Sequence, residues 1–175
     1  KLEKNKSINT ILITSNTLSS SKIFQKFKFK KTIHQFFPID TNLLVKKFLN
    51  YWNPSAAFFV DSEIWPNMIY NLNKNKIPII LMNGRITKNS FSKWEKLSYF
   101  AKDIFSKINL CFPSSKQSAK YLKQLGVKRI KYIGNLKFSQ SEYEKISSNT
   151  SEIKKFINRK KTWCASSTHK TEELL

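Results

Sequence analysis

Short apolar runs alternate with amphipathic stretches along most of the chain. The runs predict β-strands and lie at residues 8–15, 32–39, 56–60, 76–83, 108–112, 129–133 and 162–166. Several of them are continuously hydrophobic, which indicates strands covered on both faces, as in a parallel sheet wrapped by helices. Residues 97–108 instead carry apolar side chains every three or four positions, the spacing of an amphipathic helix. Repeated strand–helix alternation predicts a doubly wound α/β fold.

The domain organisation follows from a change of composition at residues 138–161. This stretch is polar, is rich in Ser, Lys and Glu, and predicts a partly helical connector. Residues 1–137 predict one Rossmann-like domain, and residues 162–175 predict the first strand and the helix start of a second α/β domain. The charged start without an initiator Met and the unfinished helix at the end predict an internal fragment of a longer protein.

Two acidic residues follow the strand at 56–60. Asp61 and Glu63 lie between this strand and a helix that opens at Pro66, since proline is tolerated in a first helical turn. In open α/β sheets, ligands bind beyond the carboxyl ends of the strands. A carboxylate can also simply cap the helix, and we favour that interpretation for Asp61 and leave it open for Glu63. A similar cap, Asp40 or Thr41, is expected at the preceding helix.

The formal charge of +21 favours anionic partners: nucleic acid, acidic lipid or a phosphorylated substrate. Lys, Asn, Ile and Phe are all abundant, so a compositional bias of the genome explains part of the Lys excess equally well. Only three residues are Arg, which argues against a nucleic-acid-binding module. Just before residue 97, two aromatic residues interleave with three lysines: Lys88, Phe91, Lys93, Trp94 and Lys96. Either the aromatic side chains pack in the core and the lysines face solvent, or the group forms a patch that rests on a membrane surface.

Cysteine and histidine give no sign of a metal site or a disulfide. Cys111 and Cys164 lie far apart in apolar runs, which predicts buried thiols in a reducing compartment. His34 and His169 have no metal-ligand spacing, and His34 is expected to be a strand residue bonded to a neighbour. We therefore expect neither a metal nor a cofactor. No apolar run approaches the roughly 20 residues that span a bilayer.

Four segments together resemble the transferases of 3-deoxy-D-manno-octulosonic acid (Kdo) in lipopolysaccharide synthesis. In order and near the family's spacing they are DSEIWPN (61–67), NGRITKNS (83–90), GNLKF (134–138) and SSTHKTEE (166–173). The resemblance implies a GT-B glycosyltransferase with two Rossmann-like domains. Residues 1–137 would be most of the acceptor-side domain, 138–161 the connector, and 162–175 the start of the donor-binding domain.

The resemblance also implies a reaction and a place for it. The donor would be CMP-Kdo, and the acceptor would be the phosphorylated glucosamine disaccharide of the lipid A precursor (lipid IVA), with release of CMP. The enzyme would work at the cytoplasmic face of the inner membrane of a Gram-negative bacterium, peripherally or anchored by a further segment. In this family a Glu upstream of these residues is the general base, so the fragment alone is expected to be inactive.

By the same resemblance, two charged residues stabilise the transition state. Five further residues are candidate substrate contacts, three of them at a strand-to-helix turn whose unpaired N–H groups favour an anion, and Arg85 beyond a strand end, where it could hold an acceptor phosphate. The stabilisers are Glu63 and Lys137; the substrate contacts are Arg85, Asn135, Ser167, Thr168 and His169. From the residues alone, each has a plainer interpretation. Lys137 is one more surface Lys, Arg85 pairs with a nearby carboxylate, and Ser167 or Thr168 caps the next helix with Glu172 in its first turn.

Two departures from the family pattern and two rival functions stay open at this stage. Asp61 stands where the family usually has Glu, and Thr171 stands where Gly is more frequent. One rival keeps the fold but changes the substrate: another GT-B nucleotide-sugar transferase or a sugar-nucleotide epimerase. The other is a basic nucleic-acid-binding module, whose affinity would fall steeply with salt.

Overall fold

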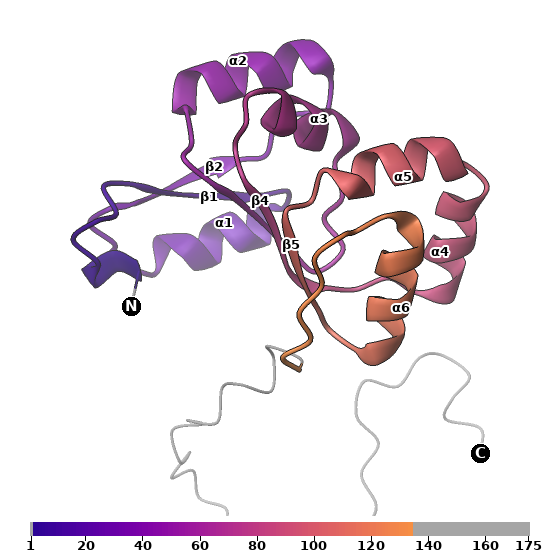
Figure 1. Cartoon of the computed structure of the whole chain (residues 1–175). Coiled ribbons are helices and arrows are strands. Elements are labelled where there is room, and N and C mark those ends of the chain that lie inside the picture. The colour runs from indigo at the N-terminus through magenta and orange to yellow at the C-terminus, as the bar shows by residue number, and fades with distance from the viewer. Residues whose placement is uncertain (1, 135–175) are drawn as a thin grey trace, which may run out of the picture. The chain divides into compact units, whose positions relative to one another are not determined.

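The computed structural model describes residues 2–134, which form alternating strands and helices (Figure 1). In chain order they are the 3₁₀ turn η1 (Leu2–Lys4), β1 (Ile11–Ser15), α1 (Leu18–Gln25), β2 (Thr32–Phe36), α2 (Asn42–Trp52), β3 (Ala57–Val60), α3 (Pro66–Lys74), β4 (Ile79–Gly84), α4 (Lys88–Glu95), α5 (Ser98–Ser106), β5 (Leu110–Pro113) and α6 (Lys116–Leu125). This confirms the predicted α/β class. The strand expected at 129–133 is reduced to one parallel bridge between Ile130 and Cys111, and the strand expected at 162–166 lies outside the described residues.

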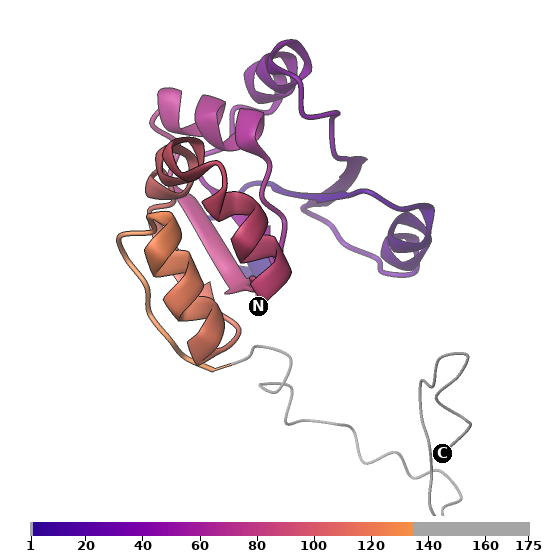
Figure 2. The ribbon, with the colours of Figure 1, turned by 90° about the vertical axis from the view of Figure 1, so that its right-hand side faces the viewer.

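All strand pairs in the described part of the chain are parallel, but the strands form two sheets rather than one. β1 pairs with β2, and β3, β4 and β5 pair in that order. Figure 2 shows the β1–α1–β2 segment lying to one side of the helices that pack on the second sheet. Hydrophobic periodicity marks a segment as a strand, but it does not say which strand lies beside it.

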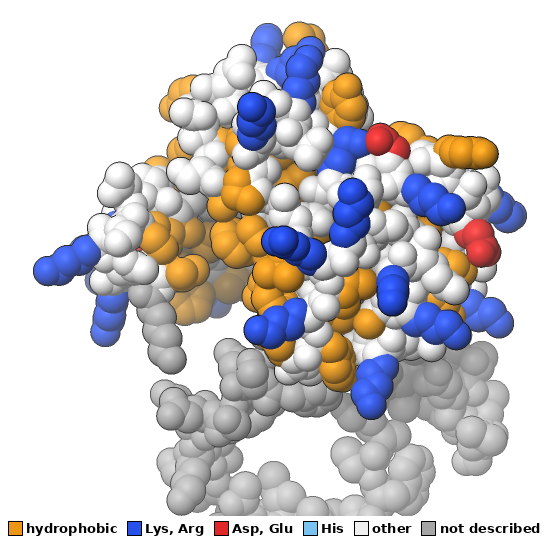
Figure 3. All heavy atoms as spheres, viewed as in Figure 1, with side chains coloured by type: hydrophobic (Ala, Val, Ile, Leu, Met, Phe, Trp, Pro, Cys, Tyr) orange, Lys and Arg blue, Asp and Glu red, His pale blue; other side chains and the backbone are white. Residues whose placement is uncertain are grey.

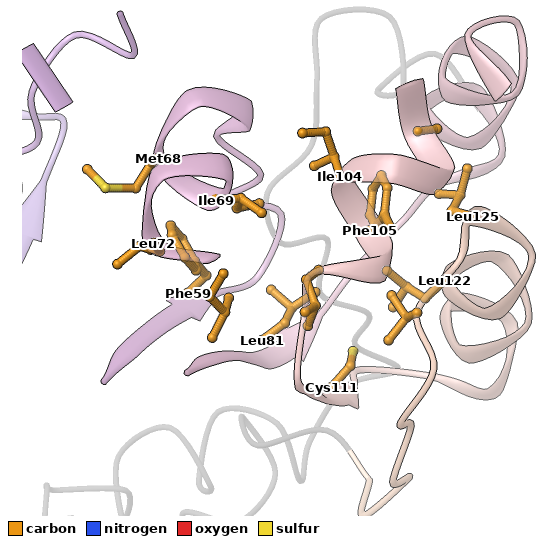
Figure 4. Packing of buried hydrophobic residues seen from close by; sticks show 14 of the residues in the cluster. Phe59, Met68, Ile69, Leu72, Leu81, Ile104, Phe105, Cys111, Leu122 and Leu125 are labelled. Atoms are coloured by element: carbon orange, nitrogen blue, oxygen red, sulfur yellow. The ribbon is translucent and has the colours of Figure 1, made fainter. Parts of the chain in front are cut away.

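The core lies on one face of the three-stranded sheet (Figure 4). Phe59, Leu81 and Cys111, one from each strand, are almost fully buried on this face. Against them pack side chains from α3, α5 and α6, which include Met68, Ile69, Leu72, Ile104, Phe105, Leu122 and Leu125. Burial of each such side chain contributes about 1.5–3 kcal/mol, so this layer dominates the stability of the domain.

Within residues 2–134, nothing packs on most of the opposite face of β3. Phe58 and Val60 alternate with Phe59 along the strand, and they remain 64% and 52% exposed. The expectation that this strand is covered on both faces is therefore wrong for the described residues. The physical reason is that the described helices of the core pack on the Phe59 side of the sheet.

The helix caps differ from those expected. Thr41 occupies the N-cap position of α2 but makes no side-chain cap bond. Asp40 instead reaches α3, where its two carboxylate oxygens accept the backbone N–H groups of Asn67 at 3.0 Å and Met68 at 2.8 Å. A carboxylate there satisfies two unpaired donors and favours the positive end of the helix dipole. The cap of α3 thus comes from a loop far upstream and not from Asp61.

Candidate active site

The carboxyl ends of β3 and β4 are joined by a short network around Asp61. Its backbone N–H donates to the Met82 carbonyl at 3.0 Å, and its own carbonyl accepts the Arg85 N–H at 3.2 Å. The Asn83 side-chain amide donates to the Asp61 carboxylate. Asp61 and Asn83 both lie in the left-handed region, with φ of 59° and 53°, a conformation that Asp and Asn tolerate better than most residues. The prediction that Asp61 caps α3 is wrong, because it holds two strand ends together.

The network around Asp61 positions Glu63 on the exposed surface just beyond β3. Glu63 Oε2 accepts the indole N–H of Trp65 at 2.6 Å and the side-chain amide of Asn16 at 3.4 Å. Asn16 follows β1, so the carboxylate lies where strand ends from both sheets approach each other. Within residues 2–134, Oε1 has no hydrogen-bond partner. One oxygen is therefore held by described residues, and the other makes no hydrogen bond to any of them.

Trp65 is itself held in place. Its ring lies 5.0 Å from that of Phe37, which follows β2, and both side chains pack against the core. Trp65 is the N-cap residue of α3 and makes no side-chain cap bond there. Sequence reasoning did not find Trp65 or Asn16 as partners of Glu63. The sequence signal that could have found Asn16 was its position directly after a strand. That position places it at the carboxyl edge of the strands, where Glu63 was also expected.

Of the other predicted site residues, the structure describes only Arg85. It follows β4 at the same edge of the sheet, and its side chain is exposed. It forms no ion pair with Asp61 or Glu63, whose positions are also described, so the expected structural pairing is absent there. The predicted residues Asn135, Lys137, Ser167, Thr168 and His169 lie outside the described part of the chain.

The chemistry of the described site is that of two carboxylates, two side-chain amides, an indole and a guanidinium. Among residues 2–134 no group of three or more His, Cys, Asp or Glu side chains could hold a metal ion. His34 bonds through Nε2 to the Ser15 hydroxyl at 2.8 Å, which confirms its expected structural role. Burial raises the pKa of the Cys111 thiol to about 12, so Cys111 is the inert, buried thiol that was expected. Cys164 lies outside the described residues.

Comparison with known proteins identifies the class and then the family. The sequence model that matches residues 1–140 is that of a glycosyltransferase domain, so the chain falls among the glycosyltransferases. The family that this model describes is 3-deoxy-D-manno-octulosonic-acid transferase (kdotransferase), and the match covers well over half of the chain. The chain belongs to the Kdo transferase family, in agreement with the resemblance drawn from its four motifs.

Individual relatives agree with this assignment. An Arabidopsis thaliana protein named "Probable 3-deoxy-D-manno-octulosonic acid transferase, mitochondrial" is 34% identical over 96% of the chain. The 3-deoxy-D-manno-octulosonic acid transferases of Rickettsia conorii and Haemophilus influenzae are 33% and 23% identical over 93% and 94% of it. The chain spans 39%, 35% and 39% of the lengths of these three relatives.

Proposed function

We propose that the full-length protein transfers Kdo from CMP-Kdo to the phosphorylated glucosamine disaccharide of a lipid A precursor, lipid IVA, and releases CMP. The observation that carries this proposal is a preoriented carboxylate, Glu63, at the carboxyl edge of parallel strands in a chain of the Kdo transferase family. In the proposed enzyme, residues 1–137 form most of the acceptor-side domain of a GT-B glycosyltransferase, and residues 162–175 begin the donor side.

The reaction breaks the bond between the anomeric carbon of Kdo and the phosphate oxygen of CMP. Positive charge develops on the sugar, negative charge develops on the leaving phosphate, and a general base takes the proton of the acceptor hydroxyl. Charges that are already aimed at these centres are often the largest catalytic contribution. Glu63, held by Trp65 through one oxygen, opposes the positive charge or orients the acceptor.

The remaining roles in the proposal rest on the motif resemblance. Lys137 meets the leaving phosphate or the Kdo carboxylate, so the mechanism requires no metal ion. Asn135, Ser167, Thr168 and His169 contact the donor. Arg85 is exposed at the sheet edge and free of ion pairs with the acidic residues there, which supports a role in gripping an acceptor phosphate.

CMP release measures the proposed activity directly. We expect the full-length protein to release CMP from CMP-Kdo only when a lipid A precursor is present, with or without EDTA. The 175-residue chain alone is expected to release none. Activity with UDP- or GDP-sugars and none with CMP-Kdo would overturn the proposal and favour the rival transferase or epimerase.

The proposed location is the cytoplasmic face of the bacterial inner membrane, where the protein would bind peripherally or through a further segment. No helix of residues 2–134 is long and apolar enough to cross a bilayer. The corner between α4 and α5 supports surface binding, because Leu97, Tyr99 and Phe100 are 58%, 91% and 47% exposed there. A shallow hollow beside them is lined by Ser90, Lys93, Trp94 and Leu97.

Charge supports the same surface. Lys93 and Lys96 are exposed beside the α4–α5 corner, and Figure 3 shows Lys and Arg side chains spread over this face with few acidic ones. Basic side chains around exposed apolar ones are typical of proteins that rest on anionic lipid. The predicted basic-aromatic group is therefore divided: Phe91 and Trp94 pack against the core, and the neighbouring lysines are solvated.

Replacing Leu97 by Asp is expected to weaken binding to vesicles with anionic lipid by about 10-fold, because a charge replaces an inserted apolar side chain. Co-sedimentation with vesicles measures the change. Tyr51→Asp is the matched control, since Tyr51 is 80% exposed on α2, away from the corner, and it should bind as the unmodified protein does. Equal losses for both variants would refute the corner as the lipid-binding surface.

A further inference from the structure

Two described side chains donate to the Glu63 carboxylate, and Trp65 lies much the closer of the two. The Trp65 indole nitrogen is 2.6 Å from Glu63 Oε2, whereas the Asn16 amide nitrogen is 3.4 Å from the same oxygen. Most N–H···O bonds in proteins measure about 2.9–3.0 Å, and those to a carboxylate are shorter and stronger. Within residues 2–134, the indole N–H therefore provides most of the hold on Glu63.

Glu63 needs such a hold because its side chain is exposed. Glutamate is among the residues that lose most rotamer freedom when their side chains are ordered. An exposed carboxylate that nothing holds spreads over several rotamers, and a catalytic group contributes to the rate only in the geometry that meets the reacting atoms. A firm hydrogen bond that selects one orientation therefore raises the rate without touching the substrate.

The local sequence fixes the backbone of Trp65. Pro66 follows it, and a residue before proline is restricted to extended conformations, in agreement with φ of −114° and ψ of 99° at Trp65. The Trp65 carbonyl accepts the N–H of Ile69 at 2.9 Å, and the Asp40 carboxylate caps the same end of α3. The direction in which the Trp65 side chain leaves the backbone is therefore defined.

The Trp65 ring is fixed by a residue from the other sheet. It lies 5.0 Å from the ring of Phe37, and both side chains pack against the core. The Phe37 N–H in turn donates to the Ser15 carbonyl at 3.1 Å, which ties Phe37 to the carboxyl end of β1. A tryptophan held by its apolar body presents its N–H in one direction, and here that direction is toward Glu63.

We propose that Trp65 is a positioning residue for the transfer reaction: its indole N–H holds the Glu63 carboxylate in the orientation that meets the reacting atoms. Trp65 acts through Glu63 and does not itself contact the substrates. The inference rests on the proposed function and adds to it a residue to which the motif resemblance assigned no role.

Replacing Trp65 by Phe in the full-length protein is expected to lower the turnover number for CMP release by about 10-fold, because one hydrogen bond to a charged group is lost. Phe keeps a ring against Phe37 but has no N–H, so Glu63 keeps its charge and loses its closest donor. The loss is smaller than that expected from removing the charge itself, since Asn16 still donates to the same oxygen. Initial rates at saturating substrates measure it.

A double-mutant cycle separates positioning from packing. If Trp65 acts through the carboxylate, Trp65→Phe should change the turnover of a Glu63→Ala variant by less than about 2-fold, because no carboxylate is left to position. If Trp65 acts only by packing, the same factor should appear in both backgrounds. Equal factors in the two backgrounds would therefore overturn the proposal.

Trp52→Phe is the matched control. The Trp52 indole N–H donates to Gln35 Oε1 at 2.7 Å, so the substitution removes an N–H···O bond of nearly the same length at the end of α2. We expect this variant to turn over normally, and urea unfolding checks that both variants are folded. Equal losses of turnover in Trp52→Phe and Trp65→Phe would contradict the positioning role, because they would reflect a general effect of losing an indole.

The indole signals in the ¹H–¹⁵N NMR spectrum of the full-length protein test the hydrogen bond without reference to the sugar. The signal missing from Trp65→Phe belongs to Trp65, and the signal missing from Trp52→Phe belongs to Trp52. We expect Glu63→Ala to shift the Trp65 indole proton upfield, because that proton loses its carboxylate acceptor, and to leave the Trp52 signal in place. An unchanged Trp65 signal would overturn the proposal.

Failure of this inference differs from failure of the proposed function. If the unmodified full-length protein released no CMP from CMP-Kdo, the proposed function would be wrong, and with it the role of Trp65 in that reaction. If the unmodified protein were active and Glu63→Ala were not, normal turnover of Trp65→Phe would show that only the positioning role is wrong.

Discussion

Replacing Glu63 by Gln in the full-length protein is expected to lower the turnover number by about 10²- to 10³-fold, the usual loss when one preorganised charge is removed from a transition state. Gln keeps the size of the side chain and an oxygen that can still accept the Trp65 N–H, so mainly the negative charge is lost. Because Glu63 is exposed, the free energy of unfolding should change by no more than about 0.5 kcal/mol. Initial rates of CMP release and urea unfolding measure the two quantities.

The matched control is Glu95→Gln, the same change at an exposed position of α4, which should turn over normally. Lys137→Ala is expected to resemble Glu63→Gln, since both would remove a charge that meets the reacting atoms. If both site variants turned over normally, the assigned roles would be wrong even though the family assignment would stand. If Glu63→Gln lowered the free energy of unfolding by as much as it raised the activation free energy, the role of Glu63 would instead be structural.

The elements of the fold were predictable because local hydrophobic patterns decide them. The runs at 8–15 and 56–60 contain β1 and β3, the run at 76–83 contains all of β4 except its last residue, and the helical spacing at 97–108 contains α5. Pairing was not predictable, since it depends on which strands meet in space. The open face at Phe58 and Val60 shows the limit: an apolar pattern reports what a residue favours, and the available neighbours decide whether it is buried.

The position of the candidate site was predictable, but its internal contacts were not. Glu63 comes directly after a strand, and the rule for open α/β sheets is enough to place it at the carboxyl edge. Its partner Asn16 is 47 residues away, and Asp40 caps α3 from 27 and 28 residues upstream. Such contacts depend on the fold as a whole, and no local pattern carries them.

The error at Asp61 has a local cause. A carboxylate between a strand and a helix commonly caps the helix, which made that interpretation the simplest one. The backbone instead enters the left-handed region at Asp61 and again at Asn83, and their side chains bond across the two strand ends. These bonds hold the short loops after β3 and β4 together. Glu63, two residues after Asp61, is therefore held at a defined position.

The stability of the domain depends on a few side chains of α5, and Phe105→Ala is expected to show this most strongly. Phe105 is 0% exposed, and its ring lies perpendicular to that of Trp94 at 5.2 Å. Removing a buried aromatic ring leaves a cavity and costs about 3–5 kcal/mol, a large share of a typical domain's 5–15 kcal/mol. Urea unfolding of the chain, followed by circular dichroism, measures the loss as a lower midpoint at an unchanged slope.

Phe100→Ala is the matched control for this prediction, because the same substitution is made on the same helix beside the same indole. Phe100 stacks on Trp94 at 6.3 Å but is 47% exposed, so its removal opens the surface and leaves no cavity. We expect it to cost about 1 kcal/mol or less, and to weaken vesicle binding if the α4–α5 corner meets lipid. Equal destabilisation by the two substitutions would contradict the assignment of Phe105 to the core, since burial is the main difference between these two rings.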